Sequence, residues 1–343
     1  MACSLLFWRL PRSIWGIACG SYSKWYKTVI IRMTKDTQDI SQYVATLCMN
    51  GLQGRMLRLP APAGTERQIL MVYGHHSTLE RWSGLAQEAN KYGAVCMPDL
   101  PGFGGMQSFC SIGEKPTLDA YADYLAAFVK LRYGKRRLTI VGMSFGFLVA
   151  TRMLQRYPDL AKQVDMLVSL VGFSHHEDFV FGRRRKRLYR AIARVLSWRL
   201  STIIFRNIAL HPLLIKHAYT RGPNSKHKFS DMSSSERQRM IDAEVKLWRV
   251  NDVYTHWRTT QAMLHVDNCS GRRVDLPVWH IYAEGDQYFN HHVTEQHLRV
   301  IFSDYHESIA HLKNHAPSVI ADAEEAAAFI PEEVREALSK ATA

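Results

Sequence analysis

Residues 139–150 read TIVGMSFGFLVA, and the order of residue types in this stretch decides the fold. An apolar, β-branched run ends at Val141, a serine then stands between two glycines, and an apolar pattern with helical spacing follows at once. The pentapeptide GMSFG at 142–146 therefore fits Gly-x-Ser-x-Gly between a predicted strand and a predicted helix. That context is typical of a nucleophile elbow, a sharp turn that presents a serine hydroxyl above a sheet.

Gly142 and Gly146 give this turn its freedom, because residues without a Cβ atom let Ser144 adopt strained backbone angles without steric clashes. The helix that begins after Ser144 would point its first amide groups at a developing negative charge. We therefore predict that Ser144 is a catalytic nucleophile. The alternative is a serine that merely fits a tight turn.

The sequence on both sides of the turn alternates between strand and helix patterns. Strands separated by helices of about 10–15 residues indicate βαβ units and a mostly parallel, buried sheet. The fold class is therefore predicted as α/β, with a mostly parallel sheet flanked by helices. The predicted strands cover residues 67–74, 94–100, 137–142, 164–173, 276–286 and 306–314, and the predicted helices cover 77–93, 117–134, 145–158 and 293–302, with terminal helices from 317.

About a hundred residues interrupt this alternation, between the predicted strand that ends near Phe173 and the one that contains Val278. They are rich in arginine, tryptophan and helical spacing, and they contain the turn signal RGPNSKHK at 221–228. An insertion this long between consecutive strands is typical of a helical cap rather than a loop. The predicted units are a basic, aromatic N-terminal tail (1–33), a core (34–175 and 274–343) and a basic helical lid (176–273).

A serine nucleophile needs a base, and the base needs an acid that orients it. His315 follows the last predicted strand in a loop, whereas His311 falls inside that strand, so His315 is the predicted base. For the acid, the loop that follows the strand at 276–286 offers two carboxylates. The candidates for the acid are Asp286 and Glu284 in that loop, and Glu177 and Asp178 after the strand at 164–173.

An oxyanion hole needs a second amide from the loop after an earlier strand. The sequence MVYGHHSTLERW at 71–82 provides such a loop, with a turn at Gly74 followed by His75. We predict that the backbone N–H groups of His75 and Phe145 form the hole. The side chains of His75 and His76 are expected to line the pocket or the surface.

Together these residues resemble the α/β-hydrolase superfamily over residues 67–330. The resemblance implies an α/β-hydrolase fold with a helical cap inserted between the sixth and seventh strands. It also implies that the acid follows the seventh strand, which selects Asp286, and that Asp99 and the glycines after it are structural. The motifs that carry it are YGHHS (73–77), DLPGFGG (99–105), GMSFG (142–146), YAEGD (282–286) and NHAPS (314–318).

Two residues depart from the usual superfamily pattern. Tyr73 stands where a histidine is usual before Gly74, and Asn314 stands where a glycine is usual before His315. Neither change removes a catalytic group. Both indicate an outlying branch whose substrate the resemblance does not supply.

A serine nucleophile argues against the aspartate-based chemistries of this superfamily. We predict a serine hydrolase that cleaves a carboxylic ester or lipid acyl bond through Ser144, His315, Asp286 and an acyl-enzyme. An acyltransferase would use the same residues, and an inactive hydrolase-fold binding protein is the remaining alternative. The expected partner is a small-molecule or lipid acyl substrate.

No cofactor and no metal are expected for this chemistry. The six cysteines are scattered without CxxC spacing, which argues against a zinc site and favours a reducing compartment. The basic residues accompany no nucleic-acid recognition motif, so no nucleic-acid partner is expected. We predict a cytoplasmic protein, with peripheral membrane contact left open.

The net charge of +13 is unevenly distributed along the chain. Residues 176–273 carry +12, whereas residues 274–343 carry −8. In the lid, helical geometry at about 100° per residue separates a basic stripe from an apolar face. Either the apolar face covers the pocket while the arginines are solvated, or the arginines face an anionic membrane or substrate. The stripe consists of Arg183, Arg187, Arg190 and Arg194, and the opposite face consists of Leu188, Ile192, Val195 and Leu196.

The N-terminal tail also has two open interpretations. Arg9, Pro11 and Arg12 divide its apolar residues into pieces far shorter than the ~20 residues of a spanning helix. Its tryptophans and basic residues suit an interfacial anchor. The alternative is a disordered leader, or an upstream extension if translation starts at Met33.

Overall fold

The computed structural model describes residues 40–211, 214–215, 233–311, 315 and 326–340. Several sequence predictions lie outside the described residues: the tail at 1–33, the turn signal at 221–228, Asn314, and the start of the terminal helices at 317.

Eight strands in the described part of the chain form one sheet, in the order β1-β2-β4-β3-β5-β6-β7-β8. All neighbours from β4 to β8 are parallel, whereas β2 is antiparallel to both β1 and β4. The predicted α/β class with a mostly parallel sheet is confirmed. The strands are β1 (Val44–Met49), β2 (Leu52–Leu59), β3 (Gln68–Val72), β4 (Ala94–Pro98), β5 (Leu138–Met143), β6 (Val164–Leu170), β7 (Val274–Ala283) and β8 (Phe302–Ala310).

The hairpin β1–β2 is missing from the sequence prediction, although its turn carries a clear signal. Met49 pairs with Leu52, so Asn50 and Gly51 form a two-residue loop, with φ angles of 52° and 78°. Two central residues with positive φ are typical of a type I′ turn, for which Asn-Gly is a preferred sequence.

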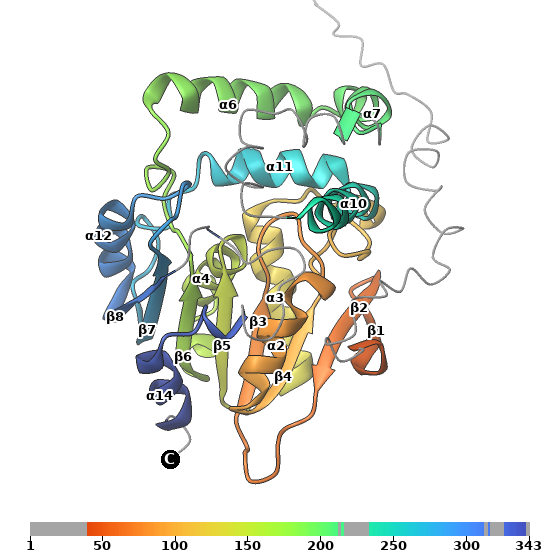
Figure 1. Ribbon diagram of the computed structural model, residues 1–343. Helices are drawn as coiled ribbons and strands as arrows, with labels where there is room; N and C mark the ends of the chain where they lie inside the picture. Colours follow the sequence, from red (N-terminus) through yellow and green to blue (C-terminus); the bar gives the residue numbers. More distant parts are fainter. Residues whose placement is uncertain (1–39, 212–213, 216–232, 312–314, 316–325, 341–343) are drawn as a thin grey trace, which may run out of the picture.

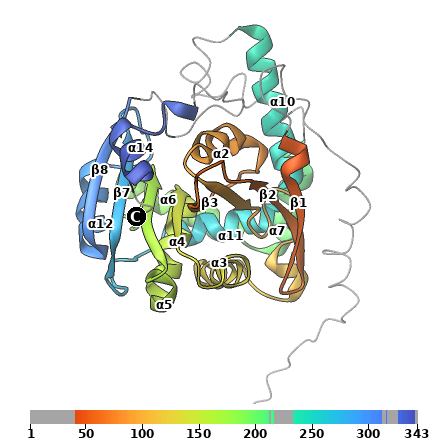
Figure 2. The same ribbon diagram turned by 90° about the horizontal axis from the view of Figure 1, so that it is seen from below.

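Helices cover both faces of the sheet, with α2 and α14 on one side and α3 and α4 on the other (Figure 2). In the described part of the chain between β6 and β7, four helices form a cap that lies beyond one end of the sheet (Figure 1). The predicted cap between these strands is confirmed. The helices of the body are α2 (Ser83–Asn90), α3 (Leu118–Tyr133), α4 (Phe145–Arg156), α5 (Pro158–Ala161), α12 (His291–Ile301) and α14 (Glu332–Lys340), with short 3-10 helices η2 (Ile40–Tyr43), η3 (Glu80–Trp82) and η4 (Phe109–Ile112). Those of the cap are α6 (Arg183–Leu196), α7 (Arg199–Ile208), α10 (Ser234–Val250) and α11 (Val253–Met263).

The two chain segments that lead into and out of the cap are joined to each other and to α12. The N–H of His176 donates to the carbonyl of Val266 at 2.8 Å, which pairs the two segments. The buried carboxylate of Asp178 accepts two backbone amides of the first segment and binds Nδ1 of His297 on α12. This hydrogen bond to Asp178 raises the pKa of His297. The base of the cap is therefore tied to the core by the Asp178–His297 hydrogen bond as well as by backbone hydrogen bonds.

The loop after β4 is organised around the buried carboxylate of Asp99. One oxygen accepts the Tyr73 hydroxyl and the other accepts Nε of Arg55, both at 3.0 Å. The Tyr73 oxygen in turn accepts the N–H of Leu100 at 2.7 Å. A Cβ atom at Gly104, whose φ is +61°, would lie 1.9 Å from the Asp99 carboxylate. The residues of this loop are thus held in place by packing and hydrogen bonds, and Tyr73 contributes through its hydroxyl.

The same loop supports the cap. The N–H of Gly104 donates to the Asn251 side chain, and the N–H of Asp252 donates to the carbonyl of Gly102, both at 2.8 Å. Asn251 and Asp252 form the turn between α10 and α11. The Asp99 network therefore fixes the position of the inner cap helices relative to the sheet.

We expect Tyr73→Phe to lower the free energy of unfolding by about 1–3 kcal/mol, because it leaves the buried Leu100 amide and one oxygen of Asp99 without this partner. Urea unfolding measures the change. The matched control is Tyr305→Phe, whose hydroxyl binds Glu307 at the exposed sheet edge and should contribute less than about 0.5 kcal/mol. Equal effects of the two variants would contradict the role assigned to Tyr73.

Candidate active site

Ser144 occupies a strained turn between β5 and α4. Its φ is 48° and its ψ is −112°, and its N–H donates to the carbonyl of Leu170 on β6 at 2.9 Å. A positive φ is uncommon outside glycine, and here it lifts the hydroxyl out of the line of the strand. The two predicted elbow glycines allow close packing around this turn. A Cβ at Gly146 would lie 2.1 Å from the carbonyl oxygen of Val72, and one at Gly142 would lie 2.6 Å from Phe147 Cα.

The structure brings Ser144, His315 and Asp286 into one hydrogen-bonded chain. His315 Nε2 lies 3.2 Å from Ser144 Oγ, and His315 Nδ1 lies 2.8 Å from Asp286 Oδ2. The other carboxylate oxygen of Asp286 accepts the amides of Tyr288 and Phe289 at 2.8 and 3.3 Å. The rings of Tyr288 and Phe289 both lie 5.2 Å from the imidazole of His315. One loop after β7 therefore orients Asp286 and also packs against His315.

The alternative acids and base lie elsewhere. Glu284 is exposed and pairs with the exposed His311 at 3.3 Å, which places both side chains in solvent. His311 follows β8, which ends at Ala310, so the predicted strand at 306–314 is shifted toward the N-terminus. Asp178 binds His297 at the base of the cap, and Glu177 is exposed. The geometry connects none of these side chains to Ser144.

The predicted oxyanion-hole residues are Phe145, directly after Ser144, and His75, in the loop after β3. Phe145 is the first residue of α4, so its amide belongs to the first turn, where amides have no partner within the helix. Gly74 is close to the elbow, since a Cβ there would lie 3.5 Å from Cβ of Ser144. The loop that carries His75 therefore passes next to Ser144, and the ring of His75 lies 5.8 Å from that of Phe145.

Three histidines meet where the cap covers this loop. The rings of His75 and His256, a residue of α11, lie 4.6 Å apart, and His75 Nε2 lies 2.8 Å from the hydroxyl of Thr259. His76 lies 4.7 Å from His256 and 4.1 Å from the ring of Trp248 on α10. Burial lowers the pKa of His75 to about 4 and lowers the pKa values of the other two well below their usual range. These imidazoles are neutral at pH 7 and pack together where α10 and α11 meet the loop after β3.

Sequence reasoning identified His75 and His76 as pocket or surface residues and missed His256. No local motif marks His256, because its neighbours in space come from a loop about 180 residues earlier in the chain. Its only sequence signal is weak: His256 stands on one helix with Thr255 and Thr259, two polar residues one turn apart.

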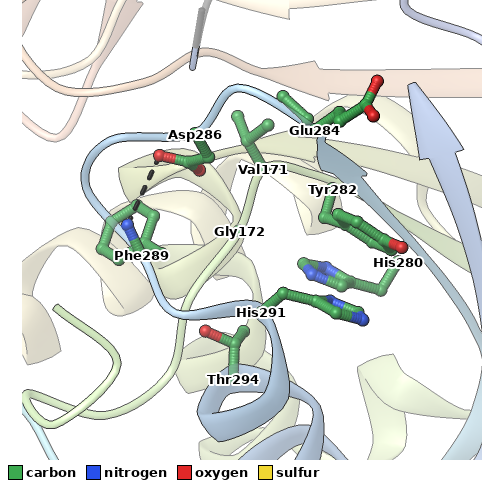
Figure 3. Close-up of a pocket in the computed structure, with 10 residues that line it drawn as sticks. Val171, Gly172, His280, Tyr282, Glu284, Asp286, Phe289, His291 and Thr294 are labelled. Atoms are coloured by element: carbon green, nitrogen blue, oxygen red, sulfur yellow. Dashed lines mark hydrogen bonds between the residues drawn. The ribbon is translucent and has the colours of Figure 1, made fainter. Parts of the chain in front are cut away.

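A cavity of about 100 Å³ lies beside the acid (Figure 3). Asp286 and Phe289 line it from the loop after β7, and His280 and Tyr282 line it from β7 itself. His280 is buried, which lowers its pKa to about 3, and its Nδ1 lies 2.9 Å from the Ser169 hydroxyl. Ser144 is not among the residues that line this cavity, whereas Asp286 is.

Two clusters among the described residues bring potential metal ligands together. They are His175, Asp178 and His297 at the base of the cap, and His291, His292 and Glu295 on α12. In the first cluster, Asp178 and His297 already bind each other directly. Neither cluster contains Ser144, His315 or Asp286.

The cap helix α6 packs through one edge of the predicted basic stripe and not through the apolar face. Arg190 is half-buried, and its Nε donates to the carbonyl of Leu264 at 2.9 Å, next to the buried Ala193. Arg190 therefore anchors α6 to the end of α11. It packs inside the cap and does not belong to the exposed basic group that was predicted. The remaining residues of that group, Arg183, Arg187 and Arg194, are exposed. The apolar face does not cover the pocket either, because Leu188, Ile192 and Val195 are exposed.

Comparison with known proteins agrees with this architecture. An esterase from Thermogutta terrifontis superimposes with a TM-score of 0.56 at 16% identity, over 88% of this chain and 98% of that one. The N-formylmaleamic acid deformylase of Pseudomonas putida S16 gives 0.54 at 15% identity, over 79% and 93%. The epoxide hydrolase CorEH gives 0.60 at 12% identity, over 86% and 96%. At these identities the likeness establishes the fold alone.

No curated protein matches the sequence. A family model described as alpha/beta hydrolase fold matches residues 68–297, which is more than half of the chain. The matched region runs from the start of β3 into α12 and includes both the elbow and the cap. The chain belongs to the alpha/beta hydrolase fold family.

Proposed function

We propose that this protein is a serine hydrolase that cleaves a carboxylic ester or lipid acyl bond. The observation that carries the proposal is the continuous hydrogen-bonded chain from Ser144 Oγ through His315 to Asp286, with separations of 3.2 and 2.8 Å. Those separations fall near the reach that a base needs to accept a proton from a nucleophile. The fold and the similar solved structures do not by themselves support this assignment, since the same fold supports several reactions.

In the proposed acylation step, Ser144 Oγ attacks the substrate carbonyl while His315 Nε2 accepts the hydroxyl proton. Asp286 stabilises the imidazolium and holds the Nδ1 proton in place. The negative charge on the carbonyl oxygen is stabilised by the amides of His75 and Phe145. Collapse of the tetrahedral intermediate breaks the ester bond, and His315 gives its proton to the departing alcohol, which leaves an acyl-enzyme.

Deacylation repeats the steps with water. His315 accepts a proton from water as the water oxygen attacks the acyl carbonyl, and it returns that proton to Ser144 when the acid departs. An acyltransferase would follow the same route with an alcohol or amine in place of water. The neutral imidazoles under the cap suit a dry acyl site because they present ring surface without a charge.

Ser144→Ala should lower kcat/KM for a nitrophenyl ester by about 10³-fold or more and leave the fold intact, because it removes only the nucleophilic oxygen. Fluorophosphonate labelling of wild type and variant measures the same residue independently. Labelling that persists in the alanine variant would overturn the assignment. Hydrolysis with added alcohol or amine acceptors, followed by product analysis, distinguishes hydrolysis from acyl transfer.

Asp286→Asn should lower kcat by about 10³–10⁴-fold with little change in stability, because the imidazole loses the acceptor that fixes its tautomer. The matched control is Glu284→Gln, an equally conservative change in the same loop at an exposed carboxylate, which should stay within about twofold of wild type. His315→Ala should resemble Ser144→Ala, and His311→Ala should resemble the control. A nearly active Asp286→Asn protein together with an inactive Asp178→Asn protein would show that the acid is assigned wrongly.

A further inference from the structure

The outer surface of the cap exposes an unusual amount of apolar side chain. Of the fifteen large apolar side chains that the described residues expose, nine lie between Leu188 and Leu214. Trp198 is 68% exposed, Leu200 69% and Ile208 63%. We call this set the α6–α7 patch; it consists of Leu188, Ile192, Val195, Trp198, Leu200, Ile203, Ile204, Ile208 and Leu214. Contiguous exposed apolar patches of this kind mark interaction surfaces.

The patch faces outward because α6 uses another face for packing. Arg190 and the buried Ala193 and Ser197 hold α6 against the inner cap, at spacings of three, four and seven residues. Leu188, Ile192 and Val195 lie on a different stripe, and α6 and α7 form the layer of the cap farthest from the sheet (Figure 1). The apolar stripe therefore does not belong to the core of the cap.

Basic residues surround the patch, and acidic residues are absent from it. The sequence of α6 and α7, from Arg183 to Ile208, contains nine arginine and lysine residues and no aspartate or glutamate. Arg184, Arg187 and Arg194 are exposed beside the apolar stripe. Amphipathic helices with a Lys/Arg-rich polar face and apolar residues that include Trp and Leu bind in the plane of a membrane interface.

Exposed apolar side chains and positive charge together decide which kind of partner fits the α6–α7 patch. A second copy of the chain would bring two strongly positive surfaces together, which repel each other. A nucleic acid would match the charge but would leave the apolar residues without a partner. An anionic bilayer accepts both, since lipid headgroups attract the arginines and the acyl boundary takes the apolar side chains. In the described part of the chain, no helix is long and apolar enough to cross a membrane.

We propose that the α6–α7 patch docks this protein peripherally on an anionic membrane, with the apolar stripe inserted at the acyl boundary and the arginines at the headgroups. The docking is independent of the proposed hydrolase activity. We further infer that the substrate is an amphipathic lipid ester taken from the same membrane. This inference rests on the proposed hydrolase activity.

The test measures co-sedimentation of the full-length Ser144→Ala protein with phosphatidylcholine vesicles, with and without phosphatidylglycerol. Because this protein lacks the proposed nucleophile, failure of docking and failure of the catalytic proposal appear in separate measurements. We expect binding to the anionic vesicles alone, weakened by salt as charges become screened. Equal recovery in the supernatant with both lipids would overturn the proposal, as would self-association through this patch without lipid binding.

Two variants with matched controls assign the binding to the patch. Arg184, Arg187 and Arg194 changed together to Gln should weaken binding by about 100-fold, since each basic residue near an anionic surface contributes a roughly fivefold share. The control changes three exposed basic residues of the body, Arg58, Lys115 and Lys135, to Gln.

The second variant removes apolar side chains. Trp198→Ser with Leu200→Ser should weaken binding at least about 10-fold, and Leu131→Ser with Val300→Ser is the exposed apolar control. Binding that survives both patch variants, or falls equally in the controls, would refute the assignment.

Discussion

The close approach of α4 to the end of β3 is the constraint on which the rest of the site depends. Gly146 lies against the backbone carbonyls of Val72 and Tyr73, at a distance that no side chain permits. The helix can therefore start directly after β5, and the single residue between them must turn sharply, with φ at 48° for Ser144. The strain is balanced by the hydrogen bond from the Ser144 amide to β6 and by the first bond of the helix, from Leu148 N–H to the Ser144 carbonyl. The position of Ser144 and the strain in its backbone thus both follow from the close packing of α4 against β3.

Most of the proposed site could be predicted from the sequence because its residues follow strands. In a parallel sheet the carboxyl ends of the strands meet at one edge, so side chains just after β5 and β7 converge although they are far apart in the chain. Ser144 and Asp286 follow this rule. Of the two carboxylates after β7, the superfamily resemblance rather than the residues selected Asp286. The structure adds the reason: its second oxygen accepts two amides of its own loop, whereas Glu284 points to solvent.

Features that depend on packing between distant segments could not be predicted in this way. His256 joins the site through contacts between the cap and the loop after β3, and no spacing in either segment indicates them. The helical periodicity of α6 correctly separated a basic stripe from an apolar one, but periodicity does not say which stripe packs. The packed residues include one member of the basic stripe, because the guanidinium of Arg190 donates to the carbonyl of Leu264 at the end of α11. The hairpin β1–β2 is a different case, since Asn50-Gly51 was a readable turn signal.

The cap can be understood as two layers with separate physical tasks. Its inner layer, α10 and α11, contacts the core through neutral imidazoles and through backbone bonds from the Asn251-Asp252 turn to the loop that Asp99 organises. Its outer layer, α6 and α7, contacts the inner one through Arg190 and Ser197 and exposes much of its apolar surface. Burying a charge costs more free energy than burying an imidazole kept neutral by its surroundings. This difference explains why imidazoles make the buried contacts of the inner layer with the loop after β3, whereas Arg183, Arg187 and Arg194 of the outer layer stay exposed.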